Sequence, residues 1–347
     1  MPRPNILFLP VDDLRPQLGC YGETQMKTPH IDELASQGTL YNRAYCQVPV
    51  CGASRASLLT GVRPQRDRFV DFLARVDEDL PGAVTLPQHF KANGYETISV
   101  GKIFHHMDDA EEQSWTCAPW KPTSKKAGRW RNYLTPENIA VAQEEGQRGP
   151  PFECADVPDN AYFDGQIADR AIAELSRLRG SDEPFFLAAG FLKPHLPFNA
   201  PKRYWDLYRE GDVHLADNPF APKDAPARAV HNWGELRSYF HVPQDGPLPE
   251  DMARTLVHGY YACTSYMDAQ VGRVLEALDC FGMAENTVVV LWGDHGWQLG
   301  EHSMWCKHCN FKTSLNAPMI FRVPDQRGGV CTDAIVEFVD IFPTLCD

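Results

Sequence analysis

The residues with the clearest chemical potential are Cys51 and Arg55, in the segment Cys51-Gly52-Ala53-Ser54-Arg55. Residues 56–60 behind them have a short helical pattern that ends at Gly61, a typical helix stop. We therefore expect Cys51 at a helix N-terminus, where unpaired N–H groups favour an anion and lower the pKa of a thiol. Arg55 would add a fixed positive charge beside it. The pattern suits a nucleophilic thiol and an anionic substrate, although a small buried cysteine ahead of a helix would show it too.

Charged and imidazole side chains follow four of the apolar runs that we predict to be strands. Ligands of open parallel sheets bind outside the carboxyl ends of the strands, so we expect these side chains to meet at one edge. Three carboxylates that meet there would repel one another unless a cation lay between them, and a hard divalent cation suits oxygen ligands. The residues are Asp12 and Asp13, Lys102 and His105, Lys193 and His195, and Asp294 and His295.

Short apolar runs alternate with helical patterns along the chain, which predicts an α/β fold with a largely parallel central sheet. The predicted strands are residues 5–11, 96–100, 185–190, 287–292 and 318–323. The predicted helices are residues 31–37, 86–92, 164–178, 250–278 and a last segment from 338. Thr85 is expected to cap the second helix and Gly94 to follow its end. Residues 111–159 and 219–249 have little periodicity, so we predict extended surface loops that shape a cleft.

Composition excludes some classes of function. A net charge of −13 over 347 residues argues against a nucleic-acid-binding protein, although a site can be locally positive. The sequence contains no run of 18 apolar residues, so it predicts no membrane span. The apolar stretch near Met1 is too short for a signal peptide. The protein is therefore expected to be cytoplasmic, or to have lost a leader. Eleven cysteines without repeating spacing predict reduced thiols.

Several segments together resemble the type I sulfatase family of the alkaline phosphatase superfamily, and within it the iduronate-2-sulfatase group. One of these is the Cys51 motif, in which Ala53 stands where many members carry proline. The resemblance extends over most of the chain and implies helices on both faces of the sheet, with a periplasmic or secreted location by analogy. The other segments are Val11-Asp12-Asp13-Leu14-Arg15, residues 94–105, Lys193-Pro194-His195, residues 265–273, and Gly293-Asp294-His295-Gly296-Trp297 with residues 299–302.

The resemblance also implies a domain assignment and two cofactors. Residues 1–347 would form a sulfatase catalytic domain that stops before most of the family's small C-terminal subdomain. A maturase would oxidise Cys51 to formylglycine, and which maturase accepts the Ala53 motif stays open. A calcium ion would be held by Asp12, Asp13, Cys51, Asp294 and His295.

The family mechanism assigns roles to the remaining candidates. One hydroxyl of the hydrated formylglycine would attack sulfur, while Lys102, Lys307 and Arg55 stabilise charge on the sulfate oxygens. His195, or Lys307 beside it, would protonate the leaving oxygen, and His105 would remove the proton of the second hydroxyl. Lys102, His195, Lys307 and Trp297 would contact the substrate.

The substrate expected from the resemblance is a sulfated oligosaccharide, with 2-sulfated iduronate of glycosaminoglycan chains as the specific hypothesis. A phosphonate or phosphate monoester hydrolase of the same superfamily is the first alternative. A non-catalytic, metal-stabilised carbohydrate-binding protein is the second, should Cys51 stay a thiol. Two smaller alternatives stay open: a zinc site at Cys306-Lys307-His308-Cys309, and a core position for Trp297.

Overall fold

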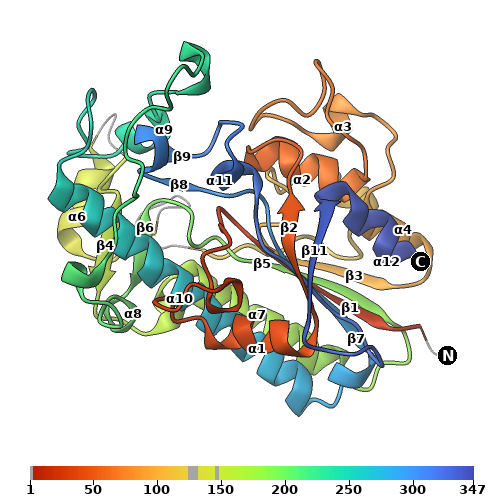
Figure 1. Cartoon of the computed structure of the whole chain (residues 1–347). Coiled ribbons are helices and arrows are strands. Elements are labelled where there is room, and N and C mark those ends of the chain that lie inside the picture. Colours follow the sequence, from red (N-terminus) through yellow and green to blue (C-terminus); the bar gives the residue numbers. More distant parts are fainter. Residues whose placement is uncertain (1–2, 124–131, 145–147) are drawn as a thin grey trace.

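A computed structural model describes residues 3–123, 132–144 and 148–347. A twisted seven-stranded sheet forms the centre of the molecule, with helices on both of its faces (Figure 1). The predicted α/β fold with a largely parallel central sheet is therefore confirmed. The parts of the predicted 111–159 loop at 124–131 and 145–147 lie outside the described residues.

The sheet has the strand order β11-β2-β10-β7-β1-β5-β3. All neighbours are parallel except β10, which runs antiparallel to both β2 and β7. The five predicted strands are confirmed as β1, β3, β5, β7 and β10, with ends shifted by at most one residue. The strands are β1 (Asn5–Val11), β2 (Thr39–Tyr45), β3 (Glu96–Gly101), β5 (Phe185–Gly190), β7 (Thr287–Gly293), β10 (Met319–Arg322) and β11 (Val330–Glu337).

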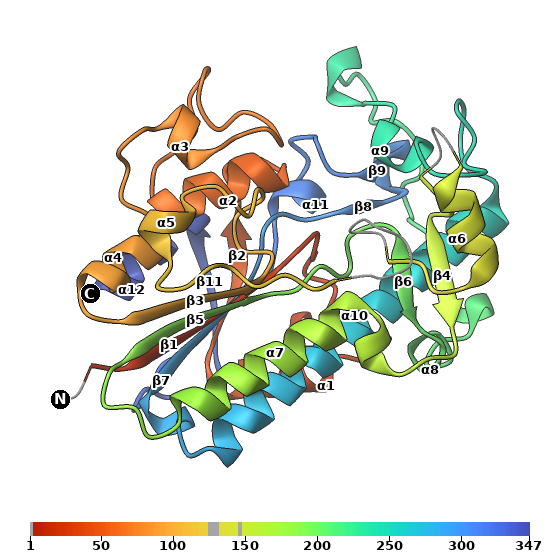
Figure 2. The ribbon, with the colours of Figure 1, turned by 180° about the vertical axis from the view of Figure 1, so that it is seen from behind.

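Alternate residues of the strands fill two separate cores. Phe8 and Trp292 pack with the helices above the sheet, whereas Leu7 and Val289 pack with the helices below it. Figure 2, the view from behind, shows the second group of helices along the lower face of the sheet. The first group is α2 (Cys51–Thr60), α4 (Leu86–Ala92) and α12 (Ile341–Cys346), and the second is α1 (Pro29–Gln37), α7 (Phe163–Leu178) and α10 (Glu250–Cys280).

The predicted helices agree with the structure to within two residues at each end, apart from the last. The α4 helix has the predicted cap, because the Thr85 hydroxyl accepts from the Gln88 N–H while the Gln88 side chain accepts from the Thr85 N–H. Gly94 follows it with a φ of 80°. The segment expected from Phe338 begins as a 3₁₀ turn over Phe338–Asp340 before α12 starts.

A third core lies beside one end of the sheet, where aromatic side chains pack around the N-terminal half of α10. The two stretches predicted to be loops contribute to this region and hold short elements, so the prediction of loops alone is wrong. No helix within the described ranges has both the length and the apolarity needed to cross a membrane. The short α-helices and strands in these two stretches are α5 (Glu111–Ser114), α6 (Pro136–Gln143), β4 (Phe152–Ala155) and α9 (Gly234–Arg237). The short ones elsewhere are α3 (Val76–Asp79), α8 (Lys202–Trp205), α11 (Lys312–Leu315), β6 (Phe198–Pro201), β8 (Gln298–Leu299) and β9 (Trp305–Cys306).

Candidate active site

The three carboxylates predicted to meet do meet, because β1 and β7 are paired in parallel up to their last residues. Val11 pairs with Gly293, so Asp12 and Asp294 follow at the same level of the sheet. Asp13 has a left-handed φ of 60°, and its N–H donates to Asp294 Oδ1 over 3.0 Å. All three side chains are at most 1% exposed. The sheet edge therefore carries a buried anionic cluster.

The α2 helix brings Cys51 to this cluster. Val50 is extended and Cys51 is the first helical residue, as the sequence predicts, and Gly61 ends the helix with a φ of 67°. Cys51 Sγ lies 3.2 Å from His295 Nε2 and 3.8 Å from Asp13 Oδ1. Burial raises the pKa of the unmodified thiol to about 12. The expectation that the helix N-terminus lowers this pKa is therefore wrong, since desolvation outweighs the helix and the nearby lysines.

Arg55 is fully buried beneath the carboxylates. Its Nε donates to Asp294 Oδ2 over 2.8 Å, and its Nη2 lies 3.5 Å from Asp12 Oδ1. Its Nη1 donates to the carbonyl oxygens of Lys102 and Ile103. These contacts hold two carboxylates and the end of β3 together. The Nη2 nitrogen has no hydrogen-bond partner, and the expected contact of Arg55 with sulfate oxygens stays a prediction.

Two lysines each contact a different carboxylate of the cluster. Lys102 Nζ lies 2.5 Å from Asp12 Oδ2, and Lys307 Nζ lies 3.0 Å and 3.1 Å from the two oxygens of Asp13. Burial opposes ionisation of Asp12, yet the charge of Lys102 holds the pKa of this carboxyl well below its usual range. For Asp13 burial dominates and raises the pKa well above its usual range. Both lysines keep raised pKa values, because the anions around them outweigh their own burial.

His195 and His105 reach the same region from the loops after β5 and β3. His195 Nε2 lies 3.8 Å from Asp13 Oδ2, while its Nδ1 donates to the carbonyl oxygen of Leu196 over 2.6 Å. Burial and the charge of Lys307 lower the pKa of His195 to about 3. Burial and the charge of Lys102 lower the pKa of His105 to about 2, and His105 Nδ1 is buried without a hydrogen-bond partner. Both imidazoles are therefore neutral at pH 7.

Lys193 and Trp297 have partners within the protein. Lys193, one of the charged side chains that follow a predicted strand, donates from Nζ to the carbonyl oxygens of His195 and Pro197 within its own loop. Trp297 is 1% exposed and packs edge-on against Phe198, with Lys307 Nζ 4.8 Å from the centre of its ring. Trp297 therefore supports Lys307 from the core, the position that the sequence left open as an alternative to a contact with the substrate.

Glu235 is the site residue that the sequence did not indicate. It lies in α9, within the predicted 219–249 loop, and its Oε1 is 3.2 Å from Lys307 Nζ and 3.4 Å from His195 Nε2. A helix of four residues is too short to show a periodic pattern, and nothing nearby distinguishes Glu235 from the other acidic residues of the chain.

The residues present fit a divalent cation. Asp12 Oδ1 is buried and has no hydrogen-bond partner. His295 Nδ1 donates to the Gly296 carbonyl oxygen, so the lone pair of its Nε2 points at Asp13 Oδ1, 3.3 Å away, and Asp294 Oδ1, 3.6 Å away. A positive centre between acceptor atoms at such distances would stabilise them. Three overlapping groups of possible ligands lie here: Asp12 and Asp294 with Cys51, Asp13 and His295 with Cys51, and Asp13 with His195 and Glu235.

The cysteine pair of the zinc alternative has other contacts. Cys309 Sγ lies 3.1 Å from Ser314 Oγ, and Cys306 is fully buried in the third core. Neither cysteine belongs to a group of three metal-ligating side chains among the described residues. All eleven cysteines are free thiols in the structure.

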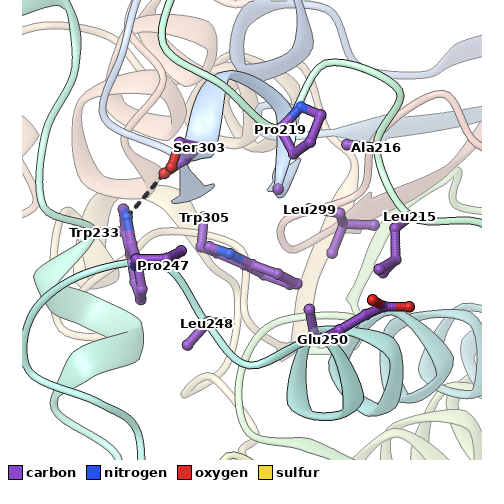
Figure 3. Close-up of a pocket in the computed structure, with 12 residues that line it drawn as sticks. Leu215, Ala216, Pro219, Trp233, Pro247, Leu248, Glu250, Leu299, Ser303 and Trp305 are labelled. Atoms are coloured by element: carbon purple, nitrogen blue, oxygen red, sulfur yellow. Dashed lines mark hydrogen bonds between the residues drawn. The ribbon is translucent and has the colours of Figure 1, made fainter.

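A separate hollow of about 160 Å³ lies behind the site and has mostly apolar walls (Figure 3). Leu215, Leu299 and Trp305 line it, together with Trp233, whose Nε1 donates to the Ser303 carbonyl oxygen over 3.1 Å. Trp233 and Trp305 each lie two residues from a charged group of the site, Glu235 and Lys307. The hollow thus backs the segments that carry these groups and holds none of the catalytic candidates.

Residues 4–347 match the family described as Sulfatase. The chain is 38% identical to the iduronate 2-sulfatase of Mus musculus, over 98% of this chain and 68% of that protein. It is 40% identical to the iduronate 2-sulfatase of Homo sapiens, over 93% of this chain and 60% of that protein. This chain therefore spans about two thirds of the length of these relatives.

Solved structures share the fold. A 2-O GAG sulfatase is 25% identical, with a TM-score of 0.71 over 99% of this chain and 70% of that one. The phosphonate monoester hydrolase of Agrobacterium radiobacter, at 23% identity, has a TM-score of 0.76 over 99% of this chain and 73% of that one, a likeness of fold. With the match to the family over nearly all of its length, the chain belongs to the sulfatase family.

Proposed function

We propose that this protein hydrolyses a sulfate ester of a sulfated sugar through Cys51 after its oxidation to formylglycine. The observation that carries the proposal is the convergence at Asp13: Cys51 Sγ lies 3.8 Å from Asp13 Oδ1, and Lys307 Nζ lies 3.0 Å from the same oxygen. Asp13 thus contacts the nucleophile position and an ammonium group that can bind an anion, and it is also a candidate ligand of the cation.

Two groups complete the site in this proposal. A calcium ion, by family analogy, would be held by Asp12, Asp13, Asp294 and His295, next to residue 51, and would supply positive charge where a sulfate binds. The oxidised side chain of residue 51 would supply, as its hydrate, the hydroxyl that attacks sulfur. Arg55 holds Asp12 and Asp294 in place for this cation.

Lys102 and Lys307 bind the sulfate group in this mechanism. Both ammonium groups are charged and contact different carboxylates, Asp12 and Asp13, so they can approach different sulfate oxygens. Of the two candidates for protonating the leaving oxygen, Lys307 carries a proton, whereas neutral His195 presents a lone pair at Nε2. We therefore assign the proton transfer to Lys307, with His195 as its neighbour at the leaving oxygen.

His105 is the proton acceptor in this proposal. Its buried Nδ1 has no hydrogen-bond partner, which leaves this nitrogen available to the proton of the second hydroxyl while sulfate leaves. Proton donor and acceptor thus lie in separate segments, after β9 and after β3.

The substrate class in this proposal is 2-sulfated uronate, including iduronate of glycosaminoglycan chains. It is supported by the likeness to the two iduronate 2-sulfatases and to the 2-O GAG sulfatase. Since Lys193 is bound to carbonyl oxygens, His195 is the side chain of that loop that faces the cluster.

One preparation tests the proposal. Protein co-expressed with a maturase should carry an aldehyde on the tryptic peptide of residues 44–55 and should desulfate a 2-sulfated uronate disaccharide far faster than glucosamine 6-sulfate. Cys51→Ser, expressed with a cysteine-type maturase, is the inactive control. Full activity of the unmodified thiol would overturn the mechanism, and faster turnover of aryl phosphate or phosphonate than of aryl sulfate would overturn the reaction. Sugar binding without turnover would point to a binding protein.

A further inference from the structure

Glu235 is a carboxylate placed among the groups that the proposed function uses to bind an anion. Both of its oxygens come within 3.2 Å of Lys307 Nζ. Its Oε1 lies 3.4 Å from His195 Nε2, and its Oε2 lies 3.4 Å from His308 Nε2. A sulfate that binds Lys307 therefore meets a negative charge on the other side of the same ammonium group. Like charges so close together weaken anion binding.

The surroundings of Glu235 hold it in this position. Trp233, which precedes α9, has a left-handed φ of 44° and is anchored to Ser303. The guanidinium of Arg237 lies 3.4 Å from the centre of the Trp233 ring and donates to the carbonyl oxygens of Asn232 and Gly246. Burial opposes ionisation of Glu235, but the charge of Lys307 holds its pKa well below the usual range. Glu235 is therefore a fixed negative charge.

Lys307 is held from three sides as a result. Asp13 accepts from its Nζ on one side, Glu235 accepts on another, and the Trp297 ring lies beneath it. The four-carbon chain of a lysine is flexible, so the acceptors around the ammonium group determine where that group lies. Without Glu235, Lys307 would keep Asp13 as an acceptor and could turn further towards a bound anion.

We propose that Glu235 is a positioning residue that lowers the affinity of the site for sulfate and aims Lys307 and His195 at the leaving oxygen. The inference rests on the proposed function and deepens it. An interaction that weakens binding of the ground-state anion while fixing the proton donor raises turnover, because only stabilisation specific to the transition state accelerates the reaction. It also favours release of the sulfate product.

Glu235→Gln and Glu235→Asp test this. Sulfate binding is measured by calorimetry on protein with unoxidised Cys51, and kcat and KM are measured on matured protein with an aryl sulfate. We expect Glu235→Gln to bind sulfate about three- to tenfold more tightly than the wild type and to lose about tenfold in kcat. Glu235→Asp keeps the charge and should recover part of both values. Asp206→Asn removes a carboxylate from a surface ion pair with Lys202 and controls for net charge.

The outcomes separate this inference from the proposed function. If the wild type neither binds sulfate nor turns over aryl sulfate, both fail. If the wild type binds sulfate and turns over aryl sulfate, the result for Glu235→Gln decides. This inference alone is overturned if that variant binds sulfate no more tightly than the wild type or keeps the full kcat of the wild type. Should Glu235→Gln not fold, Glu235→Asp decides, since retraction of the carboxylate should still tighten sulfate binding and slow turnover.

Discussion

At the residue scale, Arg55 shows how a buried cation organises anions that would otherwise repel one another. One planar guanidinium contacts Asp294, Asp12 and two carbonyl oxygens. A lysine ammonium has the charge but not the fork of donors, so Arg55→Lys would leave at least one of these acceptors without a partner. We expect a loss of about 3–5 kcal/mol in the free energy of unfolding and weaker calcium binding, because a buried charge network loses contacts. Urea unfolding measures the stability and calcium titration measures the affinity for the ion. An unchanged stability and calcium affinity would contradict this role of Arg55.

His105 makes the stability of the metal-free protein depend on pH. Its pKa is about 2 in the folded protein and about 6.5 when unfolded, so below pH 6.5 the unfolded chain binds a proton that the folded one does not. Stability is therefore complete above pH 6.5 and falls as the pH drops, by up to about 1.4 kcal/mol per pH unit from this one group.

The check compares urea midpoints between pH 7.5 and pH 5 for the wild type, His105→Gln and His214→Gln, the last at an exposed histidine. The His105 variant should lose less stability on acidification than the other two proteins. Identical pH profiles for all three would show that His105 is not buried as the structure has it.

The residues of the site were predictable where they follow strands. Asp12, Asp294 and Lys102 come directly after apolar runs, and the topology of a parallel sheet brings such positions together. The orientations of Lys193 and Trp297 were not predictable, because each depends on partners that are distant or in a turn of irregular backbone. Glu235 was missed for the same reason, since α9 is positioned by tertiary contacts of Trp233 and Arg237 and not by a local pattern.

At the element scale, α2 depends on its last residue as well as its first. Gly61 has a φ of 67°, and a Cβ added there would lie 3.3 Å from the side chain of Phe342 in α12. Gly61→Ala should therefore destabilise the protein through both the left-handed conformation and the contact, by about 1–3 kcal/mol. Gly82→Ala is a matched control, with a φ of 80° and nothing within 4 Å of the added Cβ.

Thermal unfolding of the two alanine variants separates the two causes. The difference between their melting temperatures measures the packing of α2 against α12, and equal values would show that this packing contributes nothing. Activity should fall for Gly61→Ala only if the far end of α2, which carries Cys51, shifts with it.

Among the elements, the apolar strands and long amphipathic helices were predictable, whereas β2 and β11 were not. The β11 strand is mostly exposed at the edge of the sheet, and β2 has only two buried positions, Leu40 and Ala44, among its seven residues. Their pairing, Val330 to Glu337 against Thr39 to Tyr45, joins segments almost 300 residues apart, so no local pattern marks it. Short or exposed strands take their structure from their neighbours rather than from their own sequence.

At the scale of the whole molecule, a bound cation should stabilise the fold, because the cluster joins β1, β7 and α2. If the cluster binds calcium as proposed, its removal by a chelator leaves three buried carboxylates facing one another, and a ligand at 100 times its Kd stabilises the folded state by about 2.7 kcal/mol. We expect the melting temperature to drop on chelation and to recover with added calcium. In Asp13→Ala/Asp294→Ala the chelator should have no effect, and an unchanged calcium content in that variant would remove the metal assignment.

The burial of Cys51 also has a consequence for the order of events in biosynthesis. Cys51 is 3% exposed and every residue of α2 is buried, so an oxidising enzyme can reach this thiol only while the chain is unfolded. The carboxylates beside it come together when β1 pairs with β7, whose last residue is Gly293. At about 5–20 residues per second, synthesis of the segment from residue 52 to 293 takes roughly 10–50 s. Under the proposed function, this long-range pairing would leave the thiol accessible to a maturase for that time, and later folding would bury the formylglycine.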